Sequence, residues 1–195
     1  MGSNETSVHG WKIGSSGLRE CVTKASKAAN WSQKKNNKTP FKGIGLACCN
    51  HVSGNRPFAR EFDGGSGIVR VGKDGRITVF HGESDMGQGQ NTTFAQIVAE
   101  RLGVTMDMVN VAQVDTDISP FGLGSFATRG TLMGGNGVLA AAKDAYDQMA
   151  DIAADMLNTK AADVACRKAM FFSKSSSETK ISFQDIASEA TIRHH

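Results

Sequence analysis

Long apolar runs, a secretory signal and a strong excess of one charge are all missing from this sequence of 195 residues. Because no run approaches the roughly 20 apolar residues of a membrane span, no membrane partner is expected. The polar start, 1–10, does not resemble a secretory signal. The formal net charge is only +3 and basic residues do not alternate with aromatics, so nucleic-acid binding is not expected. The one basic cluster, 34–38, is interpreted as a solvated connector.

Paired cysteine motifs are missing as well. The four cysteines are Cys21, Cys48, Cys49 and Cys166, and none forms the CxxC pair of a metal site. Adjacent residues such as Cys48 and Cys49 do not easily form a disulfide with each other. The spacing of plant-type iron–sulfur cysteines is also absent. We therefore expect reduced thiols in a cytoplasmic protein, with Cys48 and Cys49 as small buried residues.

The chain is long enough for one hydrophobic core with a small appendage, and the order of its patterns predicts an α+β fold. Residues 1–39 are expected to be a flexible N-terminus and a lead-in helix, because apolar residues recur at helical spacing from Leu18 to near Trp31. Residues 40–195 are expected to form one α+β domain with a mixed sheet, a β-hairpin and long packed helices.

Turn and cap residues divide this domain into elements. Asp74-Gly75 between two β-branched runs is a strong hairpin signal. Asn91 is expected to cap the following helix and Gly103 to end it. The predicted strands cover 42–49 (a buried one), 68–71, 77–80, 109–114, 169–172 and 180–183. The predicted helices cover 91–102, 131–157 and 183–190, and the core stripe of the longest includes Leu139, Met149 and Met156.

The longest predicted helix starts with an unfavourable segment, Gly134-Gly135-Asn136-Gly137. Each glycine costs a helix about 1 kcal/mol relative to alanine. A sequence tolerates this cost where small residues must let another group approach closely. We therefore expect a close contact at this point of the helix.

Two glycine-rich loops each connect a predicted strand with a predicted helix: a first loop, 82–89, and a second loop, 115–130. N–H groups at such a junction, with the helix dipole, can receive a phosphate or another anion, and glycine lets a large ligand lie against the backbone. Thr92 stands where a dinucleotide fingerprint needs glycine, and no P-loop pattern is present. On spacing alone, simple connectors and a site for a long ligand are equally good interpretations.

Polar residues near these loops have a functional and a structural interpretation. His81 and Glu83 have the chemistry of acid–base catalysts, but hydrogen bonds that stabilise the loop are favoured. Asp115 and Asp117 have the chemistry of a catalytic carboxylate pair. Aspartates that follow a strand more often bond to the backbone of a turn, so this second interpretation is favoured for both.

A more specific signal comes from the residues in and around the two loops: 86–93 (MGQGQNTT), 96–104 (QIVAERLGV), 115–117 (DTD) and 124–131 (GSFATRGT). In content, order and separation these blocks closely resemble the molybdenum-binding subunits of the xanthine dehydrogenase/aldehyde oxidase family. The resemblance continues with lower specificity from about Leu18 to Ala190. Within the family, the sequence more closely resembles bacterial and archaeal members that act on aromatic, heteroaromatic or aldehyde substrates, including proteins similar to hydroxybenzoyl-CoA reductase.

The resemblance implies that the two loops surround a molybdopterin cofactor. The pterin dithiolene ligates the metal, so the resemblance makes none of the loop residues a metal ligand or a catalytic group, and their role is to place and polarise the cofactor. It assigns Met86, Gly87 and Gln88 to contacts with the pterin, Ala127 to a position beside the molybdenum, and Thr128, Arg129 and Gly130 to the phosphate-bearing side. A small residue at position 127 leaves room there for substrate and metal.

The family reaction implied by the resemblance is hydroxylation with oxygen from water, or its reductive counterpart, on a small-molecule substrate. Electrons leave through iron–sulfur clusters and usually FAD, both expected on partner domains or subunits. The cofactor is expected to be molybdopterin, and its cytosine dinucleotide form stays open. The family also implies a general base, a glutamate in a Gly-Glu context near the end of the molybdenum subunit. Glu189 does not match that context and is predicted to lie on a helix surface.

We therefore expect this chain to be the middle of a larger molybdenum subunit, as an excised domain, a split subunit or a truncation. Its first partners would then be the remaining segments of that subunit, and whether the chain is itself an enzyme stays open. Two alternatives remain: a non-catalytic fold or assembly fragment that does not bind the cofactor alone, and an unrelated nucleotide binder that uses the first loop.

Overall fold

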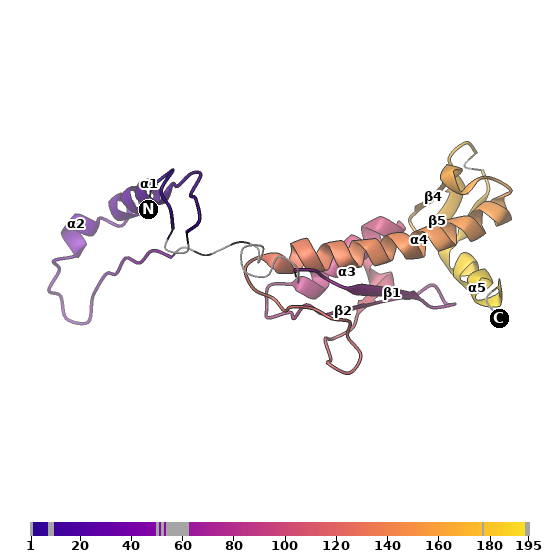
Figure 1. Ribbon diagram of the computed structural model, residues 1–195, viewed down its shortest axis with the longest axis horizontal. Coiled ribbons are helices and arrows are strands. Elements are labelled where there is room, and N and C mark those ends of the chain that lie inside the picture. Colours follow the sequence, from indigo (N-terminus) through magenta and orange to yellow (C-terminus); the bar gives the residue numbers. More distant parts are fainter. Residues whose placement is uncertain are drawn as a thin grey trace. The chain divides into compact units, whose positions relative to one another are not determined.

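The computed structural model describes residues 2–7, 10–49, 51, 53, 63–176 and 178–193. The chain divides into two compact units, Met1–His51 and Val52–His195 (Figure 1). No helix among the described residues is long and apolar enough to cross a membrane.

The first unit contains two helices, α1 (Leu18–Ala28) and the short α2 (Trp31–Lys34). They confirm the lead-in helix, which is interrupted because Asn30 adopts a left-handed conformation with φ 52°. Every residue of α1 is exposed or half-buried. Residues 34–38 are exposed, as expected for a solvated connector.

The predicted strand over 42–49 is wrong. The structure forms no strand over these residues, and all of them except Ile44 are exposed. A strand is stable only when a neighbouring strand pairs with its N–H and C=O groups. The described part of the first unit contains no such neighbour, so the apolar pattern alone is not sufficient. Cys48 and Cys49 are consequently exposed rather than buried.

The second unit begins with a mixed three-stranded sheet of β1 (Gly67–Val71), β2 (Ile77–His81) and β3 (Val109–Val111). β1 and β2 form the predicted antiparallel hairpin, with Val69 opposite Val79. β3 is shorter than predicted and runs parallel to β2. The connection between them is α3 (Gln90–Leu102), whose cap is Gly89 at φ 79° rather than the expected Asn91.

The long helix α4 (Gly135–Leu157) extends from the first sheet to a second, antiparallel sheet (Figure 1). A π-helical turn, Gly130–Gly134, precedes it. The second sheet contains β4 (Val164–Arg167), which was not predicted, with β5 (Met170–Ser173) and β6 (Lys180–Ser182), and α5 (Phe183–Arg193) follows. Short 3-10 turns over Met106–Met108 and Ala161–Asp163 precede β3 and β4. The predicted α+β architecture with a hairpin and long packed helices is confirmed.

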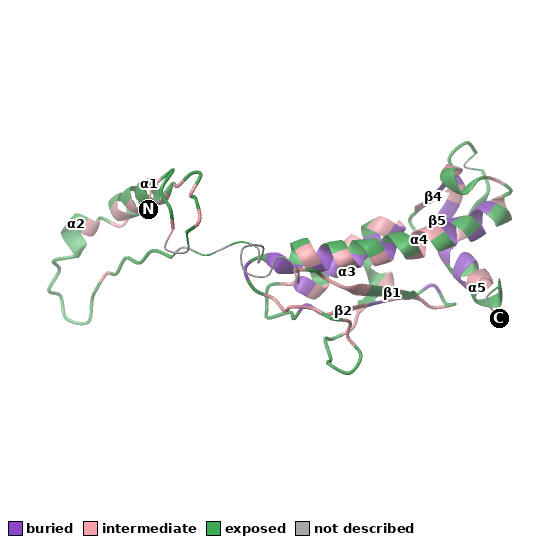
Figure 2. Ribbon diagram, in the orientation of Figure 1, coloured by how far each residue is buried: buried purple, intermediate pink, exposed green. Residues whose placement is uncertain are grey.

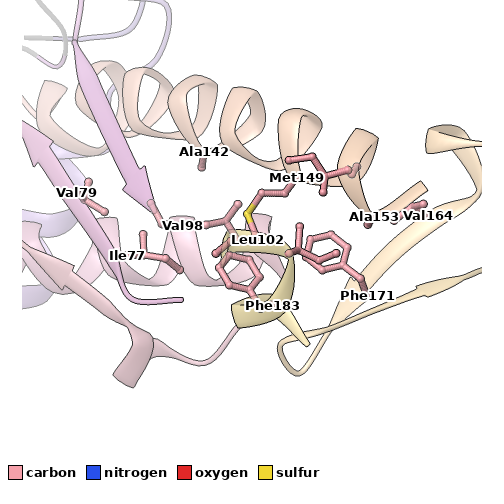
Figure 3. Packing of buried hydrophobic residues seen from close by; sticks show 14 of the residues in the cluster. Ile77, Val79, Val98, Leu102, Ala142, Met149, Ala153, Val164, Phe171 and Phe183 are labelled. Atoms are coloured by element: carbon pink, nitrogen blue, oxygen red, sulfur yellow. The ribbon is translucent and has the colours of Figure 1, made fainter. Parts of the chain in front are cut away.

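One hydrophobic core lies along α4 between the two sheets (Figure 2). Leu102 of α3, Met149 of α4 and Phe183 of α5 are all buried members of this cluster (Figure 3). The predicted core stripe is wrong at Leu139 and Met156, which are each 41% exposed. Leu139 follows buried Val138 by one residue and so points about 100° away from it, and Met156 lies in the last turn.

The glycines at the start of α4 permit the expected close contact. A Cβ atom at Gly134 would lie 2.5 Å from Cγ of Glu83 and 2.9 Å from Cζ of Phe94. Gly137 packs against the backbone of Gly65. The low helix propensity of this segment therefore lets the chain before β1 and the start of the first loop approach the helix.

Leu102→Ala is expected to lower the free energy of unfolding by about 2–5 kcal/mol, because the side chain is fully buried and its loss leaves a cavity. Leu139→Ala is the matched control and should cost about 1 kcal/mol or less, since this leucine is partly exposed. Urea denaturation measures both, and equal losses would contradict the described core.

The thiols should differ in reactivity. Burial raises the pKa of the Cys166 thiol to about 12, whereas Cys21, Cys48 and Cys49 are exposed. Because the thiolate is the nucleophile, iodoacetamide near pH ~8 should modify Cys166 much more slowly than the other three. Peptide mass spectrometry over time measures the rates, and modification of Cys166 as fast as Cys21 would contradict this burial.

Candidate functional site

The first loop connects the end of β2 with the start of α3 and is ordered by its own aspartate. The Asp85 carboxylate accepts the backbone N–H of Gly87 at 3.0 Å, of Gly89 at 3.3 Å and of Asn91 at 3.0 Å. These hydrogen bonds, the one from Asn91 first, lower the pKa of Asp85. The Asp85 carboxylate therefore accepts N–H groups that, from the sequence pattern, could have received a ligand anion. At these three N–H groups the structure shows an internal cap by Asp85.

Gln88 braces the same loop from within. Its Oε1 accepts the backbone N–H of Met86 at 2.7 Å, and its Nε2 donates to the carbonyl of Ser84 at 3.0 Å. Met86 itself is 71% exposed. The loop thus has a fixed backbone and presents an apolar side chain to the outside.

The glycines of the first loop leave its outer side open. Gly87 and Gly89 have φ values of 103° and 79°, which side-chain-bearing residues rarely adopt. A Cβ atom built on either one would meet no described protein atom within 4 Å. A flat ligand can therefore lie directly on this backbone, which fits a pterin ring system.

The second loop packs directly against the first. A Cβ atom on Gly82 would lie 2.5 Å from the carbonyl oxygen of Pro120 and from the backbone nitrogen of Gly122. The Ser125 hydroxyl donates to the carbonyl of Ser84 at 2.5 Å. The two glycine-rich loops, separated by a helix and a strand in the sequence, form one continuous surface.

The predicted site residues of the second loop are not equally accessible. Thr128 is exposed, whereas Ala127, Arg129 and Gly130 are buried. Ala127 and Thr128 both have positive φ, 47° and 61°. Two successive left-handed residues other than glycine are strained, which is common where a backbone is held in a functional geometry.

Arg129 lies inside the protein rather than along an open surface. Its side chain is 0% exposed, and its guanidinium forms ion pairs with Asp63 at 2.9 Å and with Glu83 at 2.8 Å. Burial opposes its charge, but the hydrogen bonds of Asp63 and Glu83 outweigh this effect, so the pKa of Arg129 is raised. The guanidinium is thus paired with internal partners, and the assignment of Arg129 to the phosphate-bearing side of the cofactor stays a prediction.

His81 and Glu83 have the structural roles that were favoured. His81 Nδ1 accepts the backbone N–H of Glu83 at 3.2 Å, so Nε2 carries the proton and donates to the side chain of Asn91 at 3.1 Å. Burial lowers the pKa of His81, which keeps the ring neutral. Glu83 is fully buried and pairs with Arg129.

Asp115 and Asp117 also follow the structural interpretation. The side chain of Asp115 accepts the backbone N–H of Asp117 at 2.9 Å, and the backbone of Asp115 bonds with Ser119. Both aspartates therefore form a turn. Among the described residues, no group of three or more His, Cys, Asp or Glu side chains could hold a metal ion.

Three residues of this region, Gln90, Asp85 and Asp63, were not among the predicted site residues. Gln90 is buried, lies against Gly130, and its Nε2 has no hydrogen-bond partner among the described residues. The role of Asp85 has a local signal, since an aspartate two residues before a glycine often bonds to a turn backbone. No local sequence signal indicates the role of Asp63, because its partner Arg129 is 66 residues away in the chain.

Comparisons with known proteins agree on one family. A family model described as "Molybdopterin cofactor-binding domain" matches residues 21–194. The putative xanthine dehydrogenase molybdenum-binding subunit of Escherichia coli is 31% identical over 188 residues, covering 93% of this chain and 25% of the relative. The carbon monoxide dehydrogenase large chain of Hydrogenophaga pseudoflava is 32% identical over 133 residues, covering 66% and 17%.

Solved structures show the same fold. The crystal structure of quinoline 2-oxidoreductase from Pseudomonas putida 86 matches with a TM-score of 0.67 at 22% identity, covering 91% of this chain and 22% of that one. A Cu,Mo-CO dehydrogenase structure matches with a TM-score of 0.64 at 26% identity, covering 92% and 25%. This chain therefore spans 17–25% of the length of these four proteins.

The Asp85 carboxylate should titrate below an ordinary aspartate. A pKa that is lowered in the folded state means that its contribution to stability is present above the unfolded-state pKa and is lost as the pH falls through the folded-state pKa. The amide NMR signals of Gly87 and Gly89 should follow this titration. Asp85→Asn should abolish it, while Asp144→Asn, an exposed carboxylate on α4, should not. A midpoint at or above the usual aspartate value would exclude the described loop.

Proposed function

Because the chain belongs to the molybdopterin cofactor-binding domain family of the molybdenum hydroxylases, we propose that its two glycine-rich loops form part of the cofactor shell of such an oxidoreductase. The observation that supports this proposal is the surface that the two loops form together. On it, Gly87 and Gly89 leave the backbone open, and Ser125 and Gly82 join the second loop to the first.

We infer separate roles for the residues of this surface. Met86, Gly87 and Gln88 would contact the pterin from the first loop, since they are exposed and their backbone is fixed by internal hydrogen bonds. In the second loop, Ala127 would leave space beside the metal. Thr128, Arg129 and Gly130 would line the phosphate-bearing side. No residue is given a role as metal ligand or catalytic base.

The cofactor, when bound, would supply the redox chemistry of hydroxylation with oxygen from water, or of its reductive counterpart. The protein contribution is placement, because rigid loops lose little entropy when a ligand binds. Iron–sulfur and flavin groups would belong to partner domains or subunits. The names of the relatives, which include xanthine, quinoline and carbon monoxide enzymes, support a small-molecule substrate, and we propose an aromatic, heteroaromatic or aldehyde compound.

A second candidate is a non-catalytic fragment that does not hold the cofactor by itself. The occupied N–H groups of the first loop favour it, because Asp85 removes the donors that would give the isolated chain a strong anion site. The same observation opposes a simple nucleotide binder at this loop. The chain would then contribute to the fold or assembly of the molybdenum subunit and not to the cofactor shell.

The two candidates differ in metal content after assembly. Co-expression of this chain with the reading frames adjacent to its gene, in a host that makes molybdopterin, should yield an assembly with molybdenum and pterin in proportion to the chain. Metal analysis and pterin fluorescence measure both. A stoichiometric assembly without molybdenum would refute the cofactor-shell proposal.

A matched pair of glycine variants locates the cofactor. Gly87→Ala places a methyl group on the open side of the first loop and should lower the molybdenum content of the assembly. Gly10→Ala is the control, because Gly10 also has a positive φ, 80°, with no described atom within 4 Å of an added Cβ. Equal molybdenum content in both variants would show that the cofactor does not lie on Gly87.

A further inference from the structure

Arg129 is the largest fully buried side chain among the described residues. Its guanidinium donates five hydrogen bonds: from Nε to Asp63 at 2.9 Å, from Nη1 to both oxygens of Glu83 at 2.8 Å and to the carbonyl of Gly124 at 2.9 Å, and from Nη2 to the carbonyl of Gly64 at 2.5 Å. Asp63 and Glu83 are themselves 4% and 1% exposed. All three nitrogen atoms of the guanidinium thus donate to acceptors inside the protein.

The partners of Arg129 belong to three different segments. Asp63 and Gly64 precede β1, Glu83 lies in the first loop, and Gly124 lies in the second loop together with Arg129 itself. Glu83 comes three residues before Met86, and Arg129 directly follows the strained pair Ala127–Thr128. The guanidinium therefore links the two backbone segments to which the proposed function assigns the cofactor.

The energetics favour a role in placement over a role in stability. A buried ion pair is seldom more stabilising than apolar residues of the same size, because desolvation of the charges offsets their attraction. A rigid five-donor fork, in contrast, fixes directions and distances that a hydrophobic contact leaves free. The strain at Ala127 and Thr128 also requires a neighbour that holds the backbone in place.

We propose that Arg129 is a positioning residue, which sets the relative placement of the first loop and the Ala127–Gly130 segment and so shapes the surface for the pterin. This inference rests on the proposed function only for the identity of the ligand. The placement of the loops by Arg129 is a property of the chain itself and is testable without cofactor.

Hydrogen–deuterium exchange on the full chain tests the placement directly. Arg129→Lys keeps one charge but cannot form the five bonds, so amides over 84–91 and 124–131 should exchange roughly tenfold faster. Exchange in β4, β5 and β6 should stay unchanged. Arg101→Lys is the control, because Arg101 also pairs with an aspartate, Asp147, but lies away from both loops.

A neutral triple variant separates placement from folding. Asp63→Asn and Glu83→Gln keep the shape of each side chain, and the shorter Arg129→Gln removes the third charge, so no buried unpaired charge is left to unfold the protein. The loops should still exchange faster although the urea midpoint changes little. Uniformly faster exchange across both sheets in both variants, or unchanged loop amides in either, would overturn the proposal.

The cofactor content of the assembly is a second measurement, independent of the hydrogen–deuterium exchange experiment. In the molybdenum-containing assembly, Arg129→Lys should lose most of its molybdenum and pterin, whereas Arg101→Lys should keep them. Wild-type assembly without molybdenum would refute the proposed function, while the exchange data would still decide the placement of the loops. Wild-type and Arg129→Lys assemblies with equal molybdenum would overturn the role of Arg129 in shaping the cofactor surface.

Discussion

The buried guanidinium of Arg129 is the interaction on which the candidate site depends. A charge without water is tolerated only when its donors are paired, and here two carboxylates and two carbonyls accept them. These acceptors come from the chain before β1 and from both loops. The demand of one buried charge for partners therefore adds side-chain hydrogen bonds between segments that the β1–β2 hairpin and the bridge between Gly65 and Gly122 already bring close together.

The start of α4 is built to admit this arrangement. Gly134 lets Glu83 lie against the helix, and Gly137 lets the backbone of Gly65 do the same. The helix loses propensity at these positions, and a π-helical turn precedes it. As a result, the Glu83 carboxylate pairs directly with Arg129. Helix stability is recovered further along α4, where buried residues such as Met149 and Ala153 pack against the core of the second unit.

The first loop is pre-organised by its own side chains. Asp85 accepts N–H groups of the loop and of the start of α3, and Gln88 bonds to the backbone of Ser84 and Met86. The negative charge near the helix dipole is thus supplied internally, and the outer side of the loop presents Met86 and the open glycines. In the proposed cofactor shell, such a loop would recognise shape and close backbone approach more than charge, which suits a large, flat cofactor.

Local signals were sufficient for much of the fold. The Asp74-Gly75 turn fixed the hairpin because its backbone conformation depends on those residues alone, and the apolar spacing of α3 and α4 indicated their buried faces. The blocks around Met86 and Arg129 indicated the family, which the comparisons confirm. The positions assigned to the cofactor remain proposals, because a sequence motif does not show which atoms face a ligand.

Other features needed the tertiary structure. Residues 42–49 have the pattern of a strand, yet a strand exists only where a partner pairs with it. Arg129 carries a charge that suits a phosphate, yet its partners Asp63 and Glu83 lie 66 and 46 residues away in the chain. The sequence by itself determined the turns, the helix faces and the glycine-rich loops, since these depend on neighbours in the chain. Which groups meet inside the protein was decided only by folding, because burial forces each charge to find whichever partner the packing brings close.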